Sequence, residues 1–354
     1  MNLEQKIQGF AKLGSVLVQA SNNEISSEFP DVSKRLIALI ENTHIENPWF
    51  IKEYVRYTFN QIGNSLSEKR LREWTNLYST VDLNKDTSQT IAVVMAGNIP
   101  LVGFHDFLSV LISGHKILIK QSSKDPLISE ISKILCDIDS DFIPYINFAK
   151  DKLKNFDAII ATGSNNTKRY FEYYFSKYPS IIRGHRNSVA VITGDENEDN
   201  LKKLAHDVFL YFGMGCRNVS KIYIPRDYPV KKLIEAFLGY ESILLNHHKY
   251  FNNYEYFKSI YLINREPFLD SGFFMMKQDS QLSAPLSVVY WEEYSSKKAL
   301  MNSLNEIKNN IQCIVSEDET ISPIAFGEAQ NPNWNDYADG IDVLSFLLAV
   351  KKRE

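Results

Sequence analysis

Between residues 90 and 225 the sequence alternates between short β-branched apolar runs and segments with helical spacing. The apolar runs are "TIAVVMAG", "HKILIKQ", "FDAIIAT", "NSVAVIT" and "SKIYIP", at residues 90–97, 115–121, 156–162, 187–193 and 220–225. The helical segments between them are residues 100–114, 125–138, 165–178 and 197–212. This alternation is typical of a parallel sheet buried by helices on both faces. We therefore predict an α/β fold with all five runs in one sheet, and ligand sites at the carboxyl ends of its strands.

The segments on either side of this alternation have other patterns. Residues 1–85 place apolar side chains three and four apart, which predicts helices, and the polar stretch 83–89 ends that pattern. Residues 226–320 read as a second α/β stretch, and residues 339–352 as an amphipathic helix. We accordingly predict three parts. Residues 1–205 form the helical region and the first α/β domain. Residues 206–320 form a second domain, which contains Cys216. Residues 321–354 form a C-terminal segment that returns to the first domain or contributes to an oligomer interface.

Composition and charge exclude several classes of protein. The 354 residues carry 39 basic and 43 acidic side chains, a net charge of −4, so nucleic acid is not the expected partner. Three cysteines lack metal-ligand spacing and cannot form a disulfide framework without leaving one over, so we expect no metal and a reducing cytoplasm. The first residues lack an apolar signal core, and no run approaches the ~18 apolar residues of a membrane span.

Three loops of the predicted first sheet carry polar side chains directly after a strand. The amide of Asn98, in "AGNIP", can donate a hydrogen bond into a cleft or can cap the next helix. Lys120 ends a strand, where it can reach a ribose or phosphate or can lie in solvent. Thr162, Gly163 and Ser164 lead into a helix N-terminus, which suits phosphate, although many such turns bind nothing. The G-x-G-x-x-G fingerprint of ordinary dinucleotide sites is absent.

A fourth loop, "GMGCRN" at residues 213–218, contains Cys216. Its two glycines let the backbone approach a ligand closely, and the neighbouring Arg217 would favour the reactive thiolate. A cysteine is also a small side chain that is often buried without any chemical role. The loop alone leaves both interpretations of Cys216 open.

As an ordered set, Asn98, Lys120, the Thr162–Ser164 turn and Cys216 resemble the aldehyde dehydrogenase superfamily. The sequence is more similar to its LuxC-like acyl-CoA reductase branch, over roughly residues 90 to 350. The segments that carry this resemblance are "MAGNIP", "RGHRNSVAVI", "GMGCRNVSKIYIP", "IQCIVS" and "WNDYADGIDVLSFL". The resemblance implies a parallel-sheet cofactor domain, an α/β catalytic domain and a dimer or tetramer of identical chains.

The resemblance also implies roles for these residues. Cys216 would attack the carbonyl of an acyl-CoA or another acyl thioester and form a covalent acyl-enzyme. Asn98 and the backbone N–H of Cys216 would hold the developing oxyanion. Lys120 and the Thr162–Ser164 turn would hold the adenosine and pyrophosphate half of a nicotinamide cofactor, whose hydride gives the aldehyde.

Two positions bear on the choice of cofactor. NAD-preferring relatives often have a glutamate three residues after the strand-end lysine, whereas this chain has Ser123 followed by Lys124. A serine removes repulsion of a 2′-phosphate and a lysine attracts it, so we predict a preference for NADPH. Gln281, in "QLSAPLS", aligns with a second glutamate of the family and could still bond the nicotinamide ribose through its amide.

The sequence departs from the oxidising members of the superfamily at one catalytic position. Their water-activating glutamate aligns with Arg183 or Gly184 of "RGHRN", so hydrolysis of an acyl-enzyme is expected to be poor. His185, in the same stretch, is either an acid/base group or a structural histidine. An aldehyde-oxidising dehydrogenase is therefore disfavoured, and a non-catalytic binding protein is disfavoured because Asn98, Lys120 and Cys216 occur together.

The segment 246–262 is dense in aromatic residues. As a helix it would place Tyr250, Tyr254, Phe257 and Tyr261 on one face. We expect this face to pack into the core, and the alternative is a wall for an acyl chain.

Overall fold

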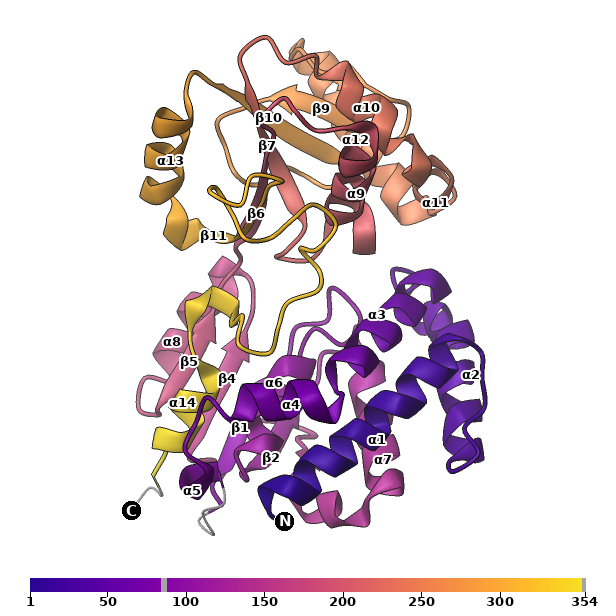
Figure 1. The fold of residues 1–354 in the computed structure, drawn as a ribbon, viewed down its shortest axis with the longest axis vertical. Helices are drawn as coiled ribbons and strands as arrows, with labels where there is room; N and C mark the ends of the chain where they lie inside the picture. Colours follow the sequence, from indigo (N-terminus) through magenta and orange to yellow (C-terminus); the bar gives the residue numbers. More distant parts are fainter. Residues whose placement is uncertain (84–87, 352–354) are drawn as a thin grey trace. The chain divides into compact units, whose positions relative to one another are not determined.

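The computed structural model describes residues 1–83 and 88–351, which form two compact units (Figure 1). Unit one consists of Met1–His185 and Asn333–Glu354, and unit two is Arg186–Pro332. Residues 84–87, within the stretch predicted to end the N-terminal helical pattern, lie outside the described residues, as do residues 352–354.

Unit one begins with the predicted helical region. Its helices are α1 (Leu3–Ser21), α2 (Pro30–Glu46), α3 (Lys52–Ser65), α4 (Glu68–Thr75) and α5 (Thr80–Leu83). Asn2 and Gln5 form a capping box at the start of α1, so two backbone N–H groups of the first turn are satisfied. Helices α1 and α3 approach closely at Gly14 and Gly63, where an added Cβ on either glycine would lie 2.7 Å from the carbonyl oxygen of the other.

A five-stranded parallel sheet follows in the order β3-β2-β1-β4-β5. Its strands are β1 (Thr90–Val94), β2 (Lys116–Lys120), β3 (Ile146–Phe148), β4 (Ala158–Thr162) and β5 (Ser180–Arg183). The connecting helices are α6 (Phe104–Ile112), α7 (Leu127–Ile138) and α8 (Asn165–Tyr174). The chain runs outward from β1 to β3 and then crosses back to β4, so the strand order reverses between β1 and β4. A ligand crevice is expected at such a reversal, outside the carboxyl ends of the strands.

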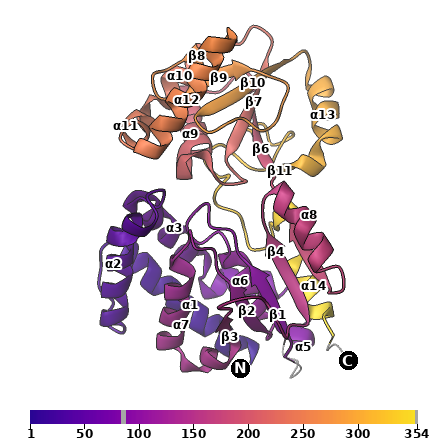
Figure 2. The same cartoon turned by 180° about the vertical axis from the view of Figure 1, so that it is seen from behind.

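The core of unit one joins the N-terminal helices, the sheet and the chain's last helix, α14 (Val343–Ala349). Figure 2 shows α14, in yellow, against the sheet. His115 fixes part of this arrangement, because its Nδ1 accepts from the N–H of Gln89 at 3.1 Å and its Nε2 lies 2.9 Å from the carbonyl oxygen of Leu347. The Nε2–H tautomer satisfies both contacts, so a neutral imidazole ties α14 to the start of the sheet.

Unit two contains a six-stranded sheet in the order β11-β6-β7-β10-β9-β8, in which only β8 is antiparallel to its neighbour. Its strands are β6 (Asn187–Val191), β7 (Val219–Pro225), β8 (Leu269–Asp270), β9 (Met275–Gln278), β10 (Val288–Tyr294) and β11 (Ile311–Val315). Its helices are α9 (Glu198–Phe209), α10 (Lys231–Phe237), α11 (Glu241–Leu245), α12 (His248–Asn264) and α13 (Lys297–Glu306).

The structure confirms an α/β fold and corrects the expected single sheet. The runs at 187–193 and 220–225 form β6 and β7 of unit two, because β6 pairs with β7 and β11, and β7 pairs with β10. The compact units accordingly divide after His185 and after Pro332, whereas we drew boundaries after residues 205 and 320. The functions assigned to the three predicted parts stay predictions.

The aromatic face of the segment 246–262 is largely core. Tyr250, Tyr254 and Tyr261 of α12 are at most 5% exposed, and the half-buried Phe257 packs beside them. The role of this face as an acyl-chain wall stays a prediction. Among the residues that the structure describes, no helix combines the length and the apolar character needed to cross a membrane.

Candidate functional site

The loop after β1 brings Asn98 to the point where the strand order reverses. Asn98 is exposed, and the loop around it is held by the neighbouring loop after β2. The buried carboxyl of Asp125 accepts from the N–H of Leu101 at 3.1 Å, and Leu101 itself has a φ of 53°. An added Cβ on Gly97 would lie 2.5 Å from the Oγ of Ser122, so only glycine allows the two loops to approach this closely.

Asp125 therefore connects three parts of unit one. Its other oxygen accepts from the N–H of Leu127 at 3.0 Å, at the start of α7. Burial raises the pKa of Asp125 to about 7, against the opposing effect of the bonds from Leu127 and Leu101. Asp125 thus positions the Asn98 loop, and because it is buried it cannot itself contact a ligand.

The end of β2 and the loop after it contain three of the predicted cofactor residues. Lys120 ends β2, and its Nζ donates to the carbonyl oxygens of Asp151 at 3.0 Å and Lys150 at 3.4 Å. Ser123 and Lys124 are exposed in the turn that follows. Lys120 therefore holds the connection between β3 and β4, while Ser123 and Lys124 have side chains open to a ligand.

The turn after β4 has the form expected for a phosphate-binding helix start. Thr162 ends β4, and Ser164 is the N-cap of α8, with its Oγ accepting from the N–H of Thr167 at 3.2 Å. Gly163 packs closely on the helix, since an added Cβ would lie 2.9 Å from Cγ2 of Thr167. The remaining N–H groups of the first turn, together with the helix dipole, can bind an anion.

The position aligned with the family's glutamate carries a buried ion pair. Arg183 ends β5, and its Nη1 donates to both carboxylate oxygens of Asp106 at 2.7 and 3.0 Å. Both side chains are less than 9% exposed, so this pair anchors α6 to β5. His185 is exposed two residues later, and its backbone N–H donates to Oδ1 of Asn165 at 2.9 Å. No carboxylate occupies the aligned positions 183 and 184.

Cys216 lies in unit two, in a tight turn before β7. Three consecutive residues upstream have positive φ angles: Tyr211 at 53°, Phe212 at 58° and Gly213 at 75°. The left-handed conformation costs a non-glycine residue about 1 kcal/mol or more, so burial of both aromatic rings must maintain it. The Cys216 side chain is half-buried at the end of this turn.

The side chain of Asn218 holds the turn together. Its Nδ2 donates to the carbonyl oxygens of Asp207 at 3.0 Å and Leu210 at 2.9 Å, with a longer contact of 3.4 Å to that of Val208. Its Oδ1 accepts from the N–H of Gly215 at 2.8 Å. Because Asn218 is 3% exposed, these bonds are protected from water and fix the backbone on either side of Cys216.

Ser188 holds the nucleophile candidate from the neighbouring strand β6. Its hydroxyl donates to the carbonyl oxygen of Cys216 at 2.9 Å and accepts from the N–H of Cys313 at 3.2 Å. The thiol of Cys313 also donates to the same hydroxyl at 3.1 Å. Burial raises the pKa of Cys313, which favours the protonated thiol there. Of these two cysteines, Cys216 is the more accessible one.

A second buried carboxyl links the Cys216 turn to residues 327–329. Asp207 accepts from the N–H groups of Gly327 at 2.7 Å and Ala329 at 3.0 Å, and the Nε of Arg217 donates to the carbonyl oxygen of Ala329. Burial raises the pKa of Asp207 to about 7, more than its two backbone bonds and the charge of Arg217 lower it. Arg217 is therefore engaged in holding the loop as well as lying next to Cys216.

Gln281 also lies in unit two, after β9. Its side chain is exposed, and its backbone N–H donates to Oδ1 of Asp279 at 3.0 Å. No group of three or more Cys, His, Asp and Glu is arranged to hold a metal ion within residues 1–83 and 88–351.

Sequence reasoning missed three residues that fix the Cys216 turn: Ser188, Asp207 and Asn218. Ser188 and Asp207 lie in runs that read as a strand and a helix, so nothing in the local pattern distinguishes them. Asn218 is part of the quoted motif "GMGCRN", and an asparagine two residues after a candidate nucleophile was a signal for a turn. Its bonds to residues 207–210 depend on how α9 ends, which the motif does not reveal.

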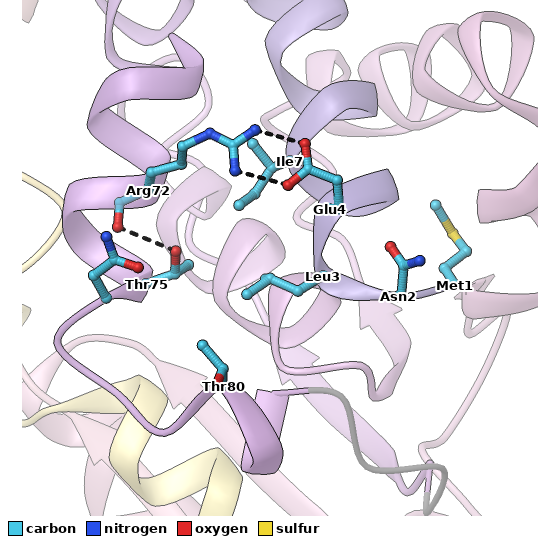
Figure 3. Close-up of a pocket in the computed structure, with 9 residues that line it drawn as sticks. Met1, Asn2, Leu3, Glu4, Ile7, Arg72, Thr75 and Thr80 are labelled. Atoms are coloured by element: carbon cyan, nitrogen blue, oxygen red, sulfur yellow. Dashed lines mark hydrogen bonds and ion pairs between the residues drawn. The ribbon is translucent and has the colours of Figure 1, made fainter.

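A separate hollow of about 660 Å³ lies in unit one, between α1 and the segment that includes α4 and the start of α5. Figure 3 shows the residues that line it. Glu4 and Arg72 form a two-fold ion pair at its side, with distances of 2.7 and 2.5 Å. Its lining contains none of the predicted site residues. We therefore do not identify this hollow with the predicted acyl or cofactor site.

Comparison with known proteins places this chain in a family. The model of the family described as acyl-CoA reductase (LuxC) matches residues 60–235, which include Asn98, Lys120, the Thr162–Ser164 turn and Cys216. A long-chain acyl-protein thioester reductase from Photorhabdus laumondii is 26% identical over 181 residues. That match covers 45% of this chain and 37% of the relative, so this chain matches well under half of that protein's length.

Solved structures agree on the fold. Aldehyde dehydrogenase 21 from Physcomitrella patens superposes with a TM-score of 0.63 at 12% identity, over 96% of this chain and 84% of that one. An NADP-dependent enzyme from E. coli gives a TM-score of 0.61 at 10% identity, over 93% and 81% of the two chains. At such low identity these matches establish the fold alone. Together with the family match, they show that this chain belongs to the LuxC acyl-CoA reductase family and has the aldehyde dehydrogenase fold.

Proposed function

We propose that this protein reduces an acyl thioester, such as a fatty acyl-CoA, to the aldehyde through an acyl-enzyme on Cys216, with NADPH as the reductant. The observation that carries the proposal is the Cys216 turn within a family of acyl-CoA reductases. In this turn Tyr211 and Phe212 have left-handed backbone conformations, and the side chain of Asn218 makes four hydrogen bonds to the backbone near the accessible thiol. Strain and buried polar bonds of this kind are common where a reactive group must be held in place.

The carboxyl edge of the first sheet fits a nicotinamide cofactor. It combines a reversal of strand order between β1 and β4 with the N-terminus of α8 and the exposed Ser123 and Lys124. These are the features that bind a pyrophosphate and a phosphorylated ribose in other α/β sheets. The nicotinamide, when bound, supplies the hydride that reduces the acyl group.

In the proposed reaction the thiolate of Cys216 attacks the carbonyl carbon of the acyl thioester. The new C–S bond forms as the bond to the leaving thiol breaks, and the leaving thiolate takes up a proton. Ser188 and Asn218 hold the backbone of the Cys216 turn throughout, so that little reorganisation is needed when the thiolate attacks. We assign Asn98 the role of an oxyanion donor, from its place after β1. Lys120, Thr162, Gly163 and Gln281 stay assigned to cofactor binding.

The same proposal predicts that the acyl-enzyme persists when no reductant is bound. Arg183 is engaged with Asp106 and Gly184 has no side chain, so these positions provide no base for water. General-base assistance is worth about 10²–10⁴ in rate, so hydrolysis should be slow. The acyl group should then stay on Cys216 until a thiol or the reductant reacts with it. His185 is the acid/base candidate of this stretch.

Intact-protein mass spectrometry tests the proposal. Mixing the protein with acyl-CoA alone should add one acyl group to the wild type within minutes and none to Cys216→Ala. Added coenzyme A should reverse the adduct, and added NADPH should convert it to aldehyde. Cys136→Ala is the matched control and should acylate normally. Steady release of free carboxylic acid without an adduct would contradict the proposal and favour an oxidising dehydrogenase or a hydrolase.

A further inference from the structure

We propose that Ser220 and Lys221, in the strand that follows the Cys216 turn, are positioning residues that hold Gln281 in place for the reduction step. Gln281 lies in the connection between β9 and β10, residues 279–287, which we call the Gln281 loop. The inference rests on the proposed function, because that function assigns Gln281 to the cofactor. It adds that the strand behind the proposed nucleophile also fixes the loop of a cofactor residue.

A β-bulge in β7 directs both side chains toward this loop. Ser188 of β6 pairs with Val219, but the next residue, Val189, pairs with Lys221, so Ser220 is an extra residue in the ladder. In a regular strand two successive side chains point to opposite faces of the sheet. The bulge interrupts that alternation, and both side chains form bonds to the connection between β9 and β10.

These two bonds lie on either side of Gln281. The Nζ of Lys221 donates to the carbonyl oxygen of Ser280 at 2.8 Å. The hydroxyl of Ser220 donates to the carbonyl oxygen of Leu282 at 2.7 Å. The side chain of Gln281 itself is exposed. The backbone is therefore held before and after Gln281, while its amide group is left open to a ligand.

Lys221 is suited to this role because it is buried. Its side chain is 0% exposed, it forms an ion pair with Glu292 of β10, and its Nζ lies 5.0 Å from the ring centre of Tyr223. A buried ammonium group needs partners for all its donors, because an unmade bond away from water is costly. The bond to the carbonyl oxygen of Ser280 supplies one of these partners, so the loop and the lysine hold each other.

A second lysine fixes the start of the Gln281 loop. The Nζ of Lys277, in β9, lies 2.8 Å from one carboxylate oxygen of Asp279. The other oxygen of Asp279 accepts from the N–H of Gln281 at 3.0 Å. The hydrogen bond from Lys277 lowers the pKa of Asp279 below its ordinary value, so this carboxylate stays charged at neutral pH. The backbone at Gln281 is thus bonded through its own N–H as well.

The Gln281 loop ends at the edge of the second sheet where Cys216 lies. Strands β7 and β10 run parallel as neighbours, with Lys221 opposite Tyr290, and both strands start at the same level of this ladder. The Cys216 turn leads into β7 and the Gln281 loop leads into β10, so both segments enter the sheet at its amino edge. Strand β7 therefore continues from one segment and is bonded to the other.

This arrangement predicts which step depends on the two bonds. A fixed backbone reduces the conformational entropy that Gln281 loses when it binds the nicotinamide ribose. Acyl transfer to Cys216 needs no nicotinamide cofactor. Loss of the bonds from Ser220 or Lys221 should therefore weaken the use of NADPH and leave acylation close to that of the wild type.

Ser220→Ala and Lys221→Met each remove one bond to the Gln281 loop. The Michaelis constant for NADPH in acyl-CoA reduction should rise about fivefold in Ser220→Ala and about tenfold or more in Lys221→Met, as for the loss of a neutral and a charge-assisted hydrogen bond. Ser220→Thr keeps a hydroxyl and should restore the wild-type constant. Ser220→Ala also carries the test alone if Lys221→Met does not fold.

A double-mutant cycle with Gln281→Ala separates positioning from a general loss of structure. If Lys221 and Ser220 act through Gln281, their substitution should have little further effect on the Michaelis constant in the Gln281→Ala protein, whereas a structural defect would add in both backgrounds. Hydrogen exchange of residues 279–287 without any ligand should be faster in both single variants. Acylation of Cys216, measured by mass, should change little.

Lys258→Met is the matched control. Lys258 also forms an ion pair, with Asp270 at 2.7 Å, and its Nζ also lies 5.2 Å from a tyrosine ring centre, but this pair joins α12 to β8. The control should leave the Michaelis constant for NADPH unchanged. An equal rise in the control, additive losses in the cycle, or a wild-type constant in both single variants would overturn the inference. A wild type that neither acylates Cys216 nor reduces acyl-CoA would instead contradict the proposed function itself.

Discussion

The Cys216 turn and the carboxyl edge of the first sheet are built in contrasting ways. Around Cys216 the supporting side chains are buried. Ser188 and Asn218 bind backbone groups of Cys216 and Gly215, and Asp207 binds the backbone of residues 327–329. At the sheet edge, Asn98, Ser123, Lys124 and Ser164 are all exposed.

The difference follows from what each region must do under the proposed function. A nucleophile stays with the chain and gains from being fixed, because orientation lowers the barrier to attack. A reduced cofactor must enter and its oxidised form must leave in every cycle, so its site needs exposed groups on a fixed backbone. Buried carboxyls or amides serve as supports in both regions, with Asp125 beneath the Asn98 loop and Asn218 beneath Cys216.

Removing the proposed nucleophile should have the largest effect. Cys216→Ala is expected to lower the rate of acyl-CoA reduction by about 10⁴-fold or more, since the proposed covalent intermediate forms on this thiol. Asn98→Ala should cost less, about 10²–10³-fold, as for other oxyanion donors. Steady-state assays of the wild type and both variants measure the two losses of rate. An Asn98→Ala loss as large as that of Cys216→Ala, or a fully active Cys216→Ala, would contradict these roles.

Asn218→Ala tests whether the Cys216 turn is held by buried bonds. The change leaves the N–H of Gly215 and the carbonyl groups of Asp207, Val208 and Leu210 without the Asn218 side chain as a partner, which should lower the free energy of unfolding by about 2–4 kcal/mol. A displaced thiol should also slow acylation by up to about 10²-fold. Urea unfolding and the rate of labelling by iodoacetamide measure the two effects.

Asn302→Ala is the matched control, because Asn302 is exposed in the middle of α13. The free energy of unfolding of this control variant should differ from that of the wild type by about 0.5 kcal/mol or less. An Asn218→Ala protein as stable and reactive as the control would show that strain in residues 211–213, and not the amide, determines the turn.

Ser123→Glu tests the exposed carboxyl edge of the first sheet, where a substitution should affect cofactor binding and leave the stability of the fold unchanged. The new carboxylate would repel a 2′-phosphate, so the Michaelis constant for NADPH should rise about tenfold to a hundredfold while that for NADH changes little. The thermal midpoint should stay within error of the wild type because Ser123 is exposed. A wild type that already prefers NADH would refute the predicted NADPH preference.

The smallest expected effect concerns the framework at the amino end of the first sheet. Burial lowers the pKa of His115 below its ordinary value of 6.5, and the charge of Lys6 acts in the same direction against the bond to Leu347 and the charge of Asp157. The unfolded chain therefore binds the proton more readily than the folded one. His115 should stabilise the fold fully above about pH 6.5, and this contribution should be lost as the pH falls further.

Urea unfolding at pH 7.5 and 5.5 measures this contribution. His115→Gln keeps a donor near Leu347 but cannot titrate, so the wild type should lose more stability than this variant between the two pH values. His105 and His206 also have lowered pKa values, and both remain in the variant, so they cancel in the comparison. An identical pH response of the two proteins would show that His115 does not titrate in this range.

The sequence by itself determined the type of fold and most of its elements. The runs at 90–97, 115–121 and 156–162 became the three central strands of the first sheet because buried parallel strands need continuous β-branched apolar residues. The ordered polar residues after those strands, with Cys216, also identified the family. Both inferences rest on local patterns and on their order along the chain.

Only the tertiary structure decided which strands pair and which side chains support the candidate site. Alternation of strands and helices does not distinguish one sheet from two, so residues 187–193 and 220–225 were placed in the wrong sheet. Ser188, Asp125 and Asn218 act on backbone groups that the chain brings to them by folding, and Arg183 reaches Asp106 across 77 positions of sequence. A buried hydrogen bond depends on the position of both partners in space, and one sequence records only that each partner is present.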